Sequence, residues 1–479
     1  MATGKLDPKD WTGFRADAHK MLDAALDKLE QAEEGRVWTP LPDAKKAELN
    51  IKVPEFGKSP SEVRNAIEGM LPYGVGNTHP RFWGWVHGTG TASGLMSDIA
   101  TSVINANLGG RDHGGIHVEK SVLRWCKEMM GFPASAGGLL TSGTSMATVI
   151  AVKCARETAL GFDIRKKGLS DLDLVGYCSE QTHSCVARAF DLLGLGSDRL
   201  RQIRCNDAFQ MDLGALEAAM TEDRAAGLRP FFVTGTAGAV NVGAIDDLEA
   251  LADLCQAQGL WYHVDGALGA AARLSPALAP LLKGMERADS LAFDFHKWMH
   301  VTYDAGCILI RDASVQLRAF SERPAYLAPA TRGLAAGDFW PVDYGPELSR
   351  GYRALKVWAH LQEHGTKALG EAVAENCRQA RLLADLVDAT SELHRVNPVT
   401  LGIVCFKYLP RRRVDSDAIN SELVIRLQES GLAVVSTTIL NQELAIRVNI
   451  TNHRTRDADL THLIKGVLAT GAEIDAEAA

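Results

Sequence analysis

The chain has 479 residues, of which 46% are hydrophobic and 23% charged, a composition typical of a soluble globular protein with a large core. Its formal net charge of −8 argues against a nucleic acid or an acidic membrane surface as a partner, because both bind basic faces. The sequence contains neither an apolar run near the ~18 residues that span a bilayer nor an apolar signal region at its start. Nine scattered cysteines without a Cys-x-x-Cys pair fit reduced thiols better than disulfides or a zinc site. We therefore expect a cytoplasmic protein without a bound metal.

The first predicted element is a helix over residues 9–34, where apolar side chains recur at three- and four-residue spacing among many charges. So short a segment, followed by the proline-bearing residues 39–42, cannot form a core of its own. We expect it to pack on a second subunit, with packing on its own chain as the alternative.

Residues 78–90 combine three aromatic side chains, two histidines and several glycines, which is unusual for a loop exposed to solvent. Aromatic and small residues suit the wall of a binding pocket. An apolar anchor for the chain is the alternative. Helices are expected next, over residues 92–107 and 116–130.

Residues 137–145 are rich in glycine and hydroxyl side chains and end where a helical pattern begins. A helix N-terminus offers free N–H groups and the positive end of the helix dipole, and Gly143, Thr144 and Ser145 add close approach and hydroxyl donors. This pattern predicts a phosphate-binding cup, with an ordinary N-cap as the alternative. A nucleotide P-loop is excluded because no Gly-Lys-Ser/Thr follows.

Strands and helices then alternate along the chain. Strands are expected over residues 174–178, 230–235 and 260–267, and helices over residues 184–193 and 246–258. This alternation predicts a parallel sheet with helices on both faces. Ligands of such sheets bind at the carboxyl ends of the strands, so we expect the cup, His183, Gly238, Asp265 and Lys297 to converge.

A further strand over residues 290–295 delivers His296 and Lys297 at its end. A lysine there is costly to bury as a cation, so it is usually neutralised, paired or used covalently. A pyridoxal phosphate (PLP) site needs an amine that forms a Schiff base and an acid that keeps the pyridine nitrogen protonated. Lys297 and Asp265, with the cup, meet this need, although single buried His or Asp residues commonly have structural roles.

Residues 321–345 lack periodicity and contain several prolines and glycines, as is typical of a mobile lid. The lid aromatics expected within reach of a substrate are Tyr326, Phe339, Trp340 and Tyr344. A helix over residues 346–364 is expected to lead into a small C-terminal domain. Its predicted strands cover residues 402–408, 432–436 and 443–448, and its predicted helices cover residues 416–429 and 456–469.

At these residues the sequence resembles the group II pyridoxal phosphate-dependent amino-acid decarboxylases, the family of aromatic L-amino acid, histidine and glutamate decarboxylases. Six landmarks carry the resemblance in order along nearly the whole chain, at residues 79–82, 141–145, 181–184, 263–267, 296–298 and 447–452. The resemblance implies an α/β enzyme of PLP fold-type I with a mostly parallel seven-stranded sheet. It also implies an N-terminal helical segment at residues 1–90 that is swapped in a homodimer, a PLP-binding large domain at 91–375 and a small α/β domain at 376–479.

The resemblance also implies roles by position. Lys297 would hold PLP covalently, His183 would lie over the pyridine ring, and Asp265 would bond its nitrogen. Thr144 and Ser145 would hold the phosphate, with Asp294 and His296 beside it. Ala267 would contact the other face of the ring. Trp85, Val86 and His87 would line the substrate pocket.

The chain departs from the family pattern at two places. Many members carry Gly-Thr-Thr where this chain has Gly238-Ala239-Val240, so a hydroxyl is missing. Tyr344 is the candidate for the lid tyrosine that protonates Cα, and loss of that tyrosine in related plant and insect enzymes yields an aldehyde. The expected function is decarboxylation of an aromatic L-amino acid to its amine and carbon dioxide. The alternatives are an oxidative-decarboxylating aldehyde synthase, a decarboxylase of acidic or basic amino acids, and an inactive binding homologue.

Overall fold

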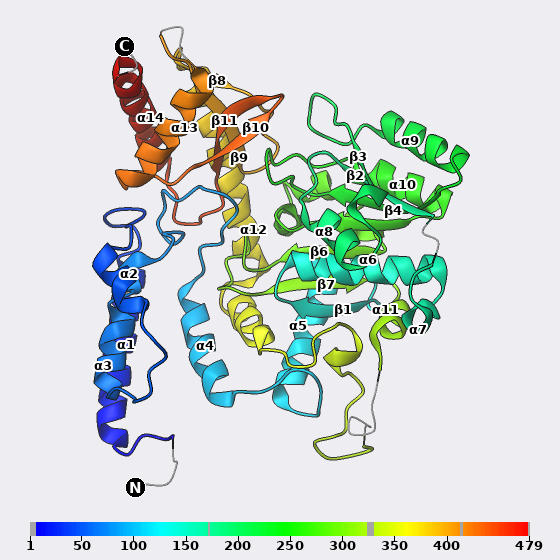
Figure 1. Ribbon diagram of the computed structural model, residues 1–479, viewed down its shortest axis with the longest axis horizontal. Coiled ribbons are helices and arrows are strands. Elements are labelled where there is room, and N and C mark those ends of the chain that lie inside the picture. The colour runs from blue at the N-terminus through cyan, green and yellow to red at the C-terminus, as the bar shows by residue number, and fades with distance from the viewer. Residues whose placement is uncertain (1–5, 171–172, 323–329, 412–414, 478–479) are drawn as a thin grey trace.

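The computed structural model describes residues 6–170, 173–322, 330–411 and 415–477, and its largest feature is a seven-stranded sheet (Figure 1). In order across the sheet the strands are β1 (Gly137–Thr141), β7 (Gly306–Ile310), β6 (Ser290–Asp294), β5 (Trp261–Asp265), β4 (Arg229–Thr236), β2 (Leu174–Ser179) and β3 (Leu200–Ile203). Strand β7 is antiparallel to both of its neighbours, and all the other neighbouring pairs are parallel. The predicted mostly parallel α/β sheet is therefore confirmed.

Helices cover both faces of this sheet, so that every residue of β1, β2, β6 and β7 is buried, as expected for strands joined by crossovers. The helices of the large domain are α5 (Gly114–Met130), α6 (Thr144–Leu160), α7 (Ile164–Lys167), α8 (Cys185–Leu192), α9 (Leu213–Ala225), α10 (Leu248–Gln258) and α11 (Ala313–Phe320). Sequence periodicity missed β3, β7 and α9, because each is short or lacks a clear apolar stripe.

The register of the strands brings the polar strand ends together at one edge of the sheet. Gly306 on β7 lies opposite Thr141 of β1 on one side and opposite Asp294 of β6 on the other. Asp265 at the end of β5 pairs with Thr236 of β4. Since α6 begins three residues after Thr141, the expected phosphate cup lies next to the ends of β5 and β6.

A four-stranded antiparallel sheet forms the small C-terminal domain. Its strands, in order, are β10 (Ser436–Leu440), β11 (Glu443–Asn449), β9 (Ile403–Tyr408) and β8 (Leu393–Arg395), and its helices are α13 (Ser416–Glu429) and α14 (Asp457–Glu477). The strand expected over residues 432–436 is wrong, because β10 only begins at Ser436. Burial, and not membership of the sheet, explains why residues 433–435 are apolar. Val434 forms an isolated bridge with Phe82 of the N-terminal segment.

The long helix α12 (Arg353–Asp388) joins the large and small domains (Figure 1). It begins later than the helix expected over residues 346–364, because contacts of Arg350 with the large domain hold the preceding loop. The Arg350 guanidinium forms an ion pair with buried Glu119 and donates to the carbonyls of Leu108 and Leu140. The helix also continues 24 residues further, past Gly365, whose left-handed backbone interrupts it. The expected domain boundary at residues 375–376 lies inside this helix.

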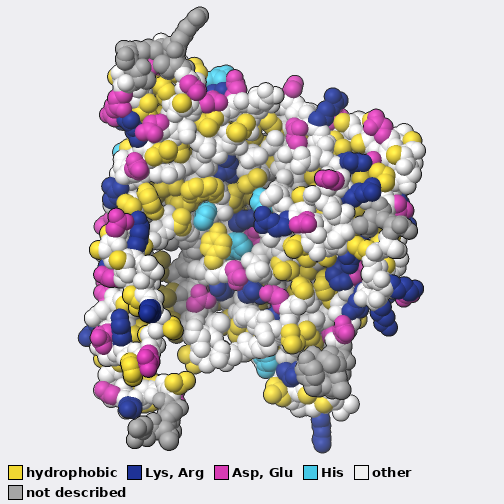
Figure 2. Space-filling model, in the orientation of Figure 1, with side chains coloured by type: hydrophobic (Ala, Val, Ile, Leu, Met, Phe, Trp, Pro, Cys, Tyr) yellow, Lys and Arg dark blue, Asp and Glu magenta, His cyan; other side chains and the backbone are white. Residues whose placement is uncertain are grey.

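The N-terminal segment stands at one side of the molecule, as Figure 1 shows. It contains α1 (Trp11–Glu30), α2 (Asp43–Leu49) and α3 (Pro60–Glu68), and α4 (Ala92–Ile104) follows it. No residue of α1 is buried, although Asp17 on α1 forms an ion pair with Arg64 on α3. A deep notch separates these helices from the large domain, and hydrophobic and histidine side chains gather at its inner end (Figure 2). None of the described helices combines the length and the apolarity that crossing a bilayer requires.

Candidate active site

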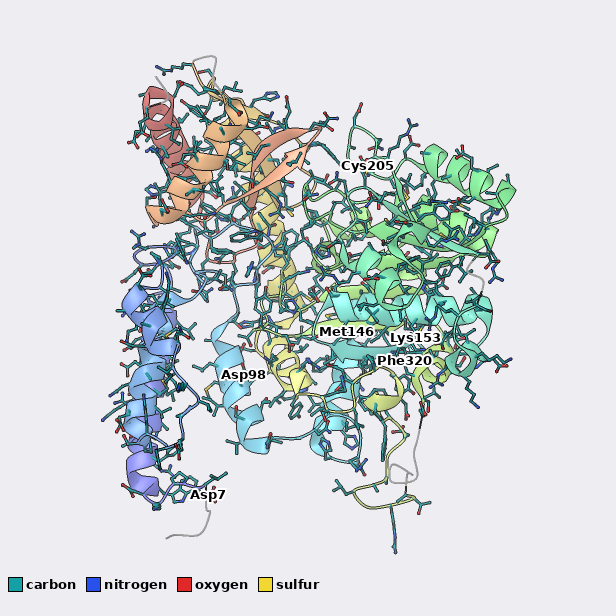
Figure 3. All side chains as sticks on the ribbon, in the orientation of Figure 1. Asp7, Asp98, Met146, Lys153, Cys205 and Phe320 are labelled. Carbon is teal, nitrogen blue, oxygen red and sulfur yellow. The ribbon has the colours of Figure 1, made fainter. Side chains whose placement is uncertain are left out.

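A cavity of about 480 Å³ opens at the carboxyl edge of the large sheet. The predicted site residues that line it are Trp85, Val86, Gly143, Thr144, Ser145, His183, Gly238, Asp265, Ala267, Asp294, His296 and Lys297. The structure thus brings together all of the predicted site residues except His87 and Tyr344. Met146, in the first turn of α6 and labelled in Figure 3, lines the cavity as well.

Lys297 follows β6 and places its amine against the carboxylate at the end of that strand. Lys297 Nζ lies 2.8 Å from Oδ2 of Asp294, which is almost fully buried. Burial by itself would lower the pKa of Lys297, but the charge and hydrogen bond of Asp294, with the charge of Asp265, outweigh burial and raise that pKa above its ordinary value. The free amine is therefore held as a cation that has an immediate proton acceptor.

The predicted cup forms at the start of α6. The backbone N–H of Thr144 donates to Asp294 Oδ1 over 2.8 Å. The Thr144 hydroxyl is buried and has no hydrogen-bond partner among the described residues. Gly306 permits close approach here, because a Cβ at that position would collide with Gly143 and Asp294. A buried hydroxyl donor at a helix N-terminus fits the phosphate of PLP.

Asp265 lies at the end of β5 and is buried. Its Oδ1 accepts a hydrogen bond from the backbone N–H of Ala267 at 3.1 Å, and its Oδ2 is 3.8 Å from Cys185 Sγ. These are its only hydrogen bonds to the residues that the structure describes. Capacity to accept a further proton donor, such as a pyridine N–H, therefore remains.

His183 precedes α8 and reaches the same cavity from the far side of β5. Its Nδ1 accepts from the backbone N–H of Cys185 at 3.2 Å, which places the proton of the neutral ring on Nε2. Burial, with the positive charge of Lys297 adding to it, lowers the pKa of His183, although the charge of Asp265 acts against this. His183 is therefore a neutral, flat ring, suited to stacking on a pyridine ring.

A row of four ring side chains begins at His296, the residue before Lys297, and Tyr303 is its second member. The Tyr303 ring lies 4.5 Å from His296 and 6.2 Å from His87, measured between ring centroids. His87 in turn lies 6.1 Å from Trp85. His87 thus packs between two residues that line the cavity but does not line it itself. Sequence reasoning missed Tyr303, although its place six residues after Lys297 was a usable signal.

The loop that carries Trp85 is fixed against the lysine loop. Trp85 has a left-handed backbone, with φ of 49°, which is uncommon for a bulky residue and typical of functional sites. The carbonyl of Trp85 accepts from Arg447 Nη1 at 2.9 Å. Gly88 touches the carbonyl of His296, and no larger residue would fit there.

Arg447, from the last family landmark, is a structural cation rather than a lining residue. Its guanidinium donates to the carbonyls of Trp85, Val240 and Asn241 and to the Ser436 hydroxyl. Burial lowers the pKa of Arg447 to about 10. This residue joins the small domain to two loops of the cavity.

The hydroxyl expected to be missing near Val240 has a substitute in Thr236. Thr236 lines the cavity at the end of β4, and its hydroxyl is 3.2 Å from that of Thr182. Gly238 and Val240 also line the cavity. The absence of Gly-Thr-Thr therefore does not leave this strand end without a hydroxyl.

Tyr344 lies outside the cavity. Its ring packs 5.1 Å from that of Phe339, and its carbonyl accepts from Gln316 Nε2 at 2.8 Å. Both aromatic rings line a separate groove beside α5. Trp340 is buried against Gly110, and Tyr326, the other tyrosine of the expected lid, lies outside the described residues.

The residues that line the cavity fit PLP in their chemistry: they supply an amine, a buried carboxylate, a flat neutral imidazole and, at a helix N-terminus, a buried hydroxyl without a described partner. Within the described parts of the chain, no cluster of three or more His, Cys, Asp and Glu side chains has the geometry to hold a metal ion. Organic cofactor chemistry is what this donor set supports.

Comparison with known proteins agrees with this chemistry. Residues 42–409 match the family model described as the pyridoxal-dependent decarboxylase conserved domain. The aromatic-L-amino-acid decarboxylase of Bacillus atrophaeus is 33% identical over 440 residues, which cover 90% of each chain. The histidine decarboxylase of Drosophila melanogaster is 31% identical over 475 residues, which cover 94% of this chain and 54% of that relative.

Solved structures share the fold over the whole chain. The TDC of Oryza sativa, crystallised with PLP and tryptamine, superposes with a TM-score of 0.88 at 24% identity, covering 98% of this chain and 100% of that chain. The fold-type I architecture expected from the sequence is thereby confirmed.

Proposed function

Because the chain belongs to the pyridoxal-dependent decarboxylase family and is a PLP-dependent carboxy-lyase of amino acids, we propose that its substrate is an aromatic L-amino acid. The products would be the corresponding amine and carbon dioxide. One observation carries this proposal: in the row of rings formed by His296, Tyr303, His87 and Trp85, all but His87 line the same cavity as Lys297.

When bound, PLP supplies a pyridinium ring that accepts the electron pair left on Cα after carbon dioxide departs. The residues of the chain prepare this step. Asp265 is placed to hold the proton on the ring nitrogen, and His183 is placed to fix the tilt of the ring. The Lys297 amine must lose a proton before its nitrogen can attack a carbonyl, and Asp294 Oδ2 is the acceptor in contact with it.

Charge in the cavity supports an aromatic over an acidic substrate. Among the described residues that line the cavity, Lys297 is the sole lysine or arginine, and it is already paired with Asp294. A second carboxylate on the substrate would therefore meet no free cation, and desolvating it would cost free energy. The aromatic row instead offers the ring contacts that aromatic side chains prefer.

Two alternatives remain within the family. The similarity to a histidine decarboxylase supports histidine as a substrate, since an imidazole would also pack on the aromatic row. An oxidative-decarboxylating aldehyde synthase would have the same cofactor contacts and differ in the fate of the Cα electron pair. Peroxide and ammonia released with each turnover would identify that chemistry.

The test is a panel of all standard L-amino acids on the purified holoenzyme, with carbon dioxide, amine and peroxide measured together. The proposal expects stoichiometric amine and carbon dioxide from tyrosine, tryptophan or phenylalanine and a kcat/KM at least ~100-fold lower for aspartate, glutamate and lysine. Higher turnover of an acidic or basic amino acid, histidine included, would overturn it.

We also propose that the enzyme is a cytoplasmic homodimer. The apolar side chains of α1 support the dimer, because Trp11, Phe14 and Leu26 are 61%, 42% and 44% exposed and the helix buries none of its own residues. The nine cysteines are all free, which suits a reducing compartment. Light scattering should give twice the mass of 51.7 kDa, and a monomer would refute the dimer.

A further inference from the structure

Cys185 occupies the first position of α8 and lines the cavity together with His183 and Asp265, the two side chains that are placed to contact the PLP ring. Its backbone N–H donates to His183 Nδ1 at 3.2 Å, and its sulfur lies 3.8 Å from Asp265 Oδ2. A single residue therefore contacts both the imidazole and the carboxylate.

The thiol has one proton and two acceptors within reach. The Thr148 hydroxyl oxygen is also 3.8 Å from the sulfur. This hydroxyl donates its own hydrogen bond to the carbonyl of Thr144 at 2.8 Å. The thiol proton therefore goes to Asp265 or to Thr148. A carboxylate is the stronger acceptor, so the proton goes to Asp265.

The thiol stays protonated in this setting. Burial, and next the negative charge of Asp265, raise the pKa of Cys185 well above its ordinary value. A thiolate would repel the carboxylate, whereas a thiol can only donate to it. The contact is thus a hydrogen bond from sulfur to oxygen.

A second observation joins this contact to the phosphate cup. The unpartnered, buried hydroxyl of Thr144 belongs to the same residue whose carbonyl receives the Thr148 hydrogen bond. A continuous series of contacts hence runs from Asp265 through Cys185 and Thr148 to Thr144, that is, from the ring-nitrogen acid to the phosphate end of the cavity.

We propose that Cys185 is a positioning residue, whose thiol fixes the plane of the Asp265 carboxylate so that one oxygen faces the pyridine nitrogen. Ala267 N–H holds Oδ1 and the thiol holds Oδ2, so neither oxygen can rotate away. The proposal rests on the role given to Asp265 above. It adds that this role depends on a proton donor at position 185 rather than on the volume of the side chain.

Three substitutions separate donation from packing. Cys185→Ser keeps a donor, Cys185→Ala removes it, and Cys185→Val removes it while filling the space. PLP affinity of the apoenzyme, measured by titration, is expected to fall about fivefold in the alanine and valine variants and to stay within about twofold in the serine variant, since a neutral hydrogen bond to a charged group is lost or kept. The visible spectrum of the bound cofactor titrates with the nitrogen that joins it to Lys297 and responds to the charge on the ring, so its pH dependence should change in the alanine and valine variants only.

The control is Cys154→Ala, which removes a fully buried thiol of α6 that has no described hydrogen bond. It should leave PLP affinity unchanged. If the alanine variant does not fold, the valine and serine variants decide whether Cys185 acts as a hydrogen-bond donor or through packing. A packing role would make valine the mildest change and serine the most damaging, and that order would overturn the proposal.

Asp265→Asn tests the role of Asp265 separately from the role of Cys185. If this variant binds PLP and shows the same spectrum as the unchanged enzyme, the role given to Asp265 is wrong. If Asp265→Asn loses the cofactor while Cys185→Ala and Cys185→Val behave as the unchanged enzyme does, only the role of Cys185 is wrong.

Discussion

Lys297 Nζ lies 2.8 Å from Asp294 Oδ2, so the amine that is placed to hold the cofactor has its counter-ion at the end of the preceding strand, β6. The other oxygen of the same carboxylate accepts from the N–H of Thr144. Asp294 therefore contacts both ends of the cavity, the amine and the phosphate cup. A lysine that was expected to be either paired or used covalently is paired in the free protein and remains available for covalent use.

Asp294→Asn should make the amine easier to deprotonate. The carboxylate raises the pKa of Lys297, while burial lowers it. Removing this charge leaves the charge of Asp265 as the main influence that opposes burial, so the pKa of Lys297 falls and more amine is neutral at a given pH. We expect the midpoint of the pH profile for the rate of PLP attachment to the apoenzyme to move down by about 1–3 pH units.

Stopped-flow absorbance across pH measures this shift, and Asp312→Asn is the control because that side chain only caps α11. An unchanged midpoint, or one that moves up, would contradict the role of Asp294.

Thr144→Val should lower the affinity for PLP without lowering the thermal stability of the apoenzyme. The hydroxyl is buried without a described partner, so removing it costs the empty site nothing and relieves a desolvated polar group. With the phosphate bound it would supply a charge-assisted hydrogen bond, worth about 10- to 100-fold in affinity. Thermal melting of the apoenzyme and PLP titration measure the two effects.

Thr158→Val, which removes a hydroxyl bonded to the carbonyl of Cys154 on the same helix, is the matched control. A Thr144→Val apoenzyme that melts lower, together with unchanged PLP affinity, would mean that this hydroxyl does not hold the phosphate.

Tyr303 should contribute its ring more than its hydroxyl. Tyr303→Ala removes the centre of the aromatic row and is expected to raise KM for aromatic substrates about 3- to 10-fold with little change in kcat. Tyr303→Phe keeps the ring next to His296 and should stay within about twofold. Steady-state kinetics with phenylalanine, whose ring has no hydroxyl, separates the two variants, and equal KM values for both would refute the aromatic wall.

The Cα proton donor is tested by product analysis. In the structure Tyr344 packs on Phe339 away from the cavity, so Tyr344→Phe should leave the ratio of amine to aldehyde unchanged. Tyr326→Phe, at the other tyrosine of the expected lid, is the comparison and should raise the aldehyde fraction. Aldehyde and peroxide are measured at the same turnover. A rise in the Tyr344→Phe variant would show that this tyrosine reaches the reacting carbon in the assembled enzyme.

Strand ends were the most predictable part of the site. Asp265 and Lys297 could be placed from alternation and from the rule that ligands bind at the carboxyl edge, since both depend on local pattern alone. Cys185 and Thr236 could not be placed, because their relevance comes from register between strands and from loop packing that a single sequence does not display.

The C-terminal errors have a similar cause. Residues 432–435 are apolar enough for a strand, but they do not join the sheet. Ala433 and Val435 are buried in the core of the small domain, and Val434 packs on Phe82 of the N-terminal segment. The start of α12 was misplaced because the buried pair of Arg350 and Glu119, which joins residues 231 positions apart, holds the preceding loop. Tertiary contacts of this kind override local propensity.

The most direct test is to reduce the holoenzyme with borohydride, digest it and locate the residue that carries the pyridoxyl group by mass spectrometry. The account predicts one modified site, Lys297, and no modification in Lys297→Ala, whose far-ultraviolet circular dichroism should be unchanged. A pyridoxyl group on another lysine, or full decarboxylase activity in Lys297→Ala, would contradict it.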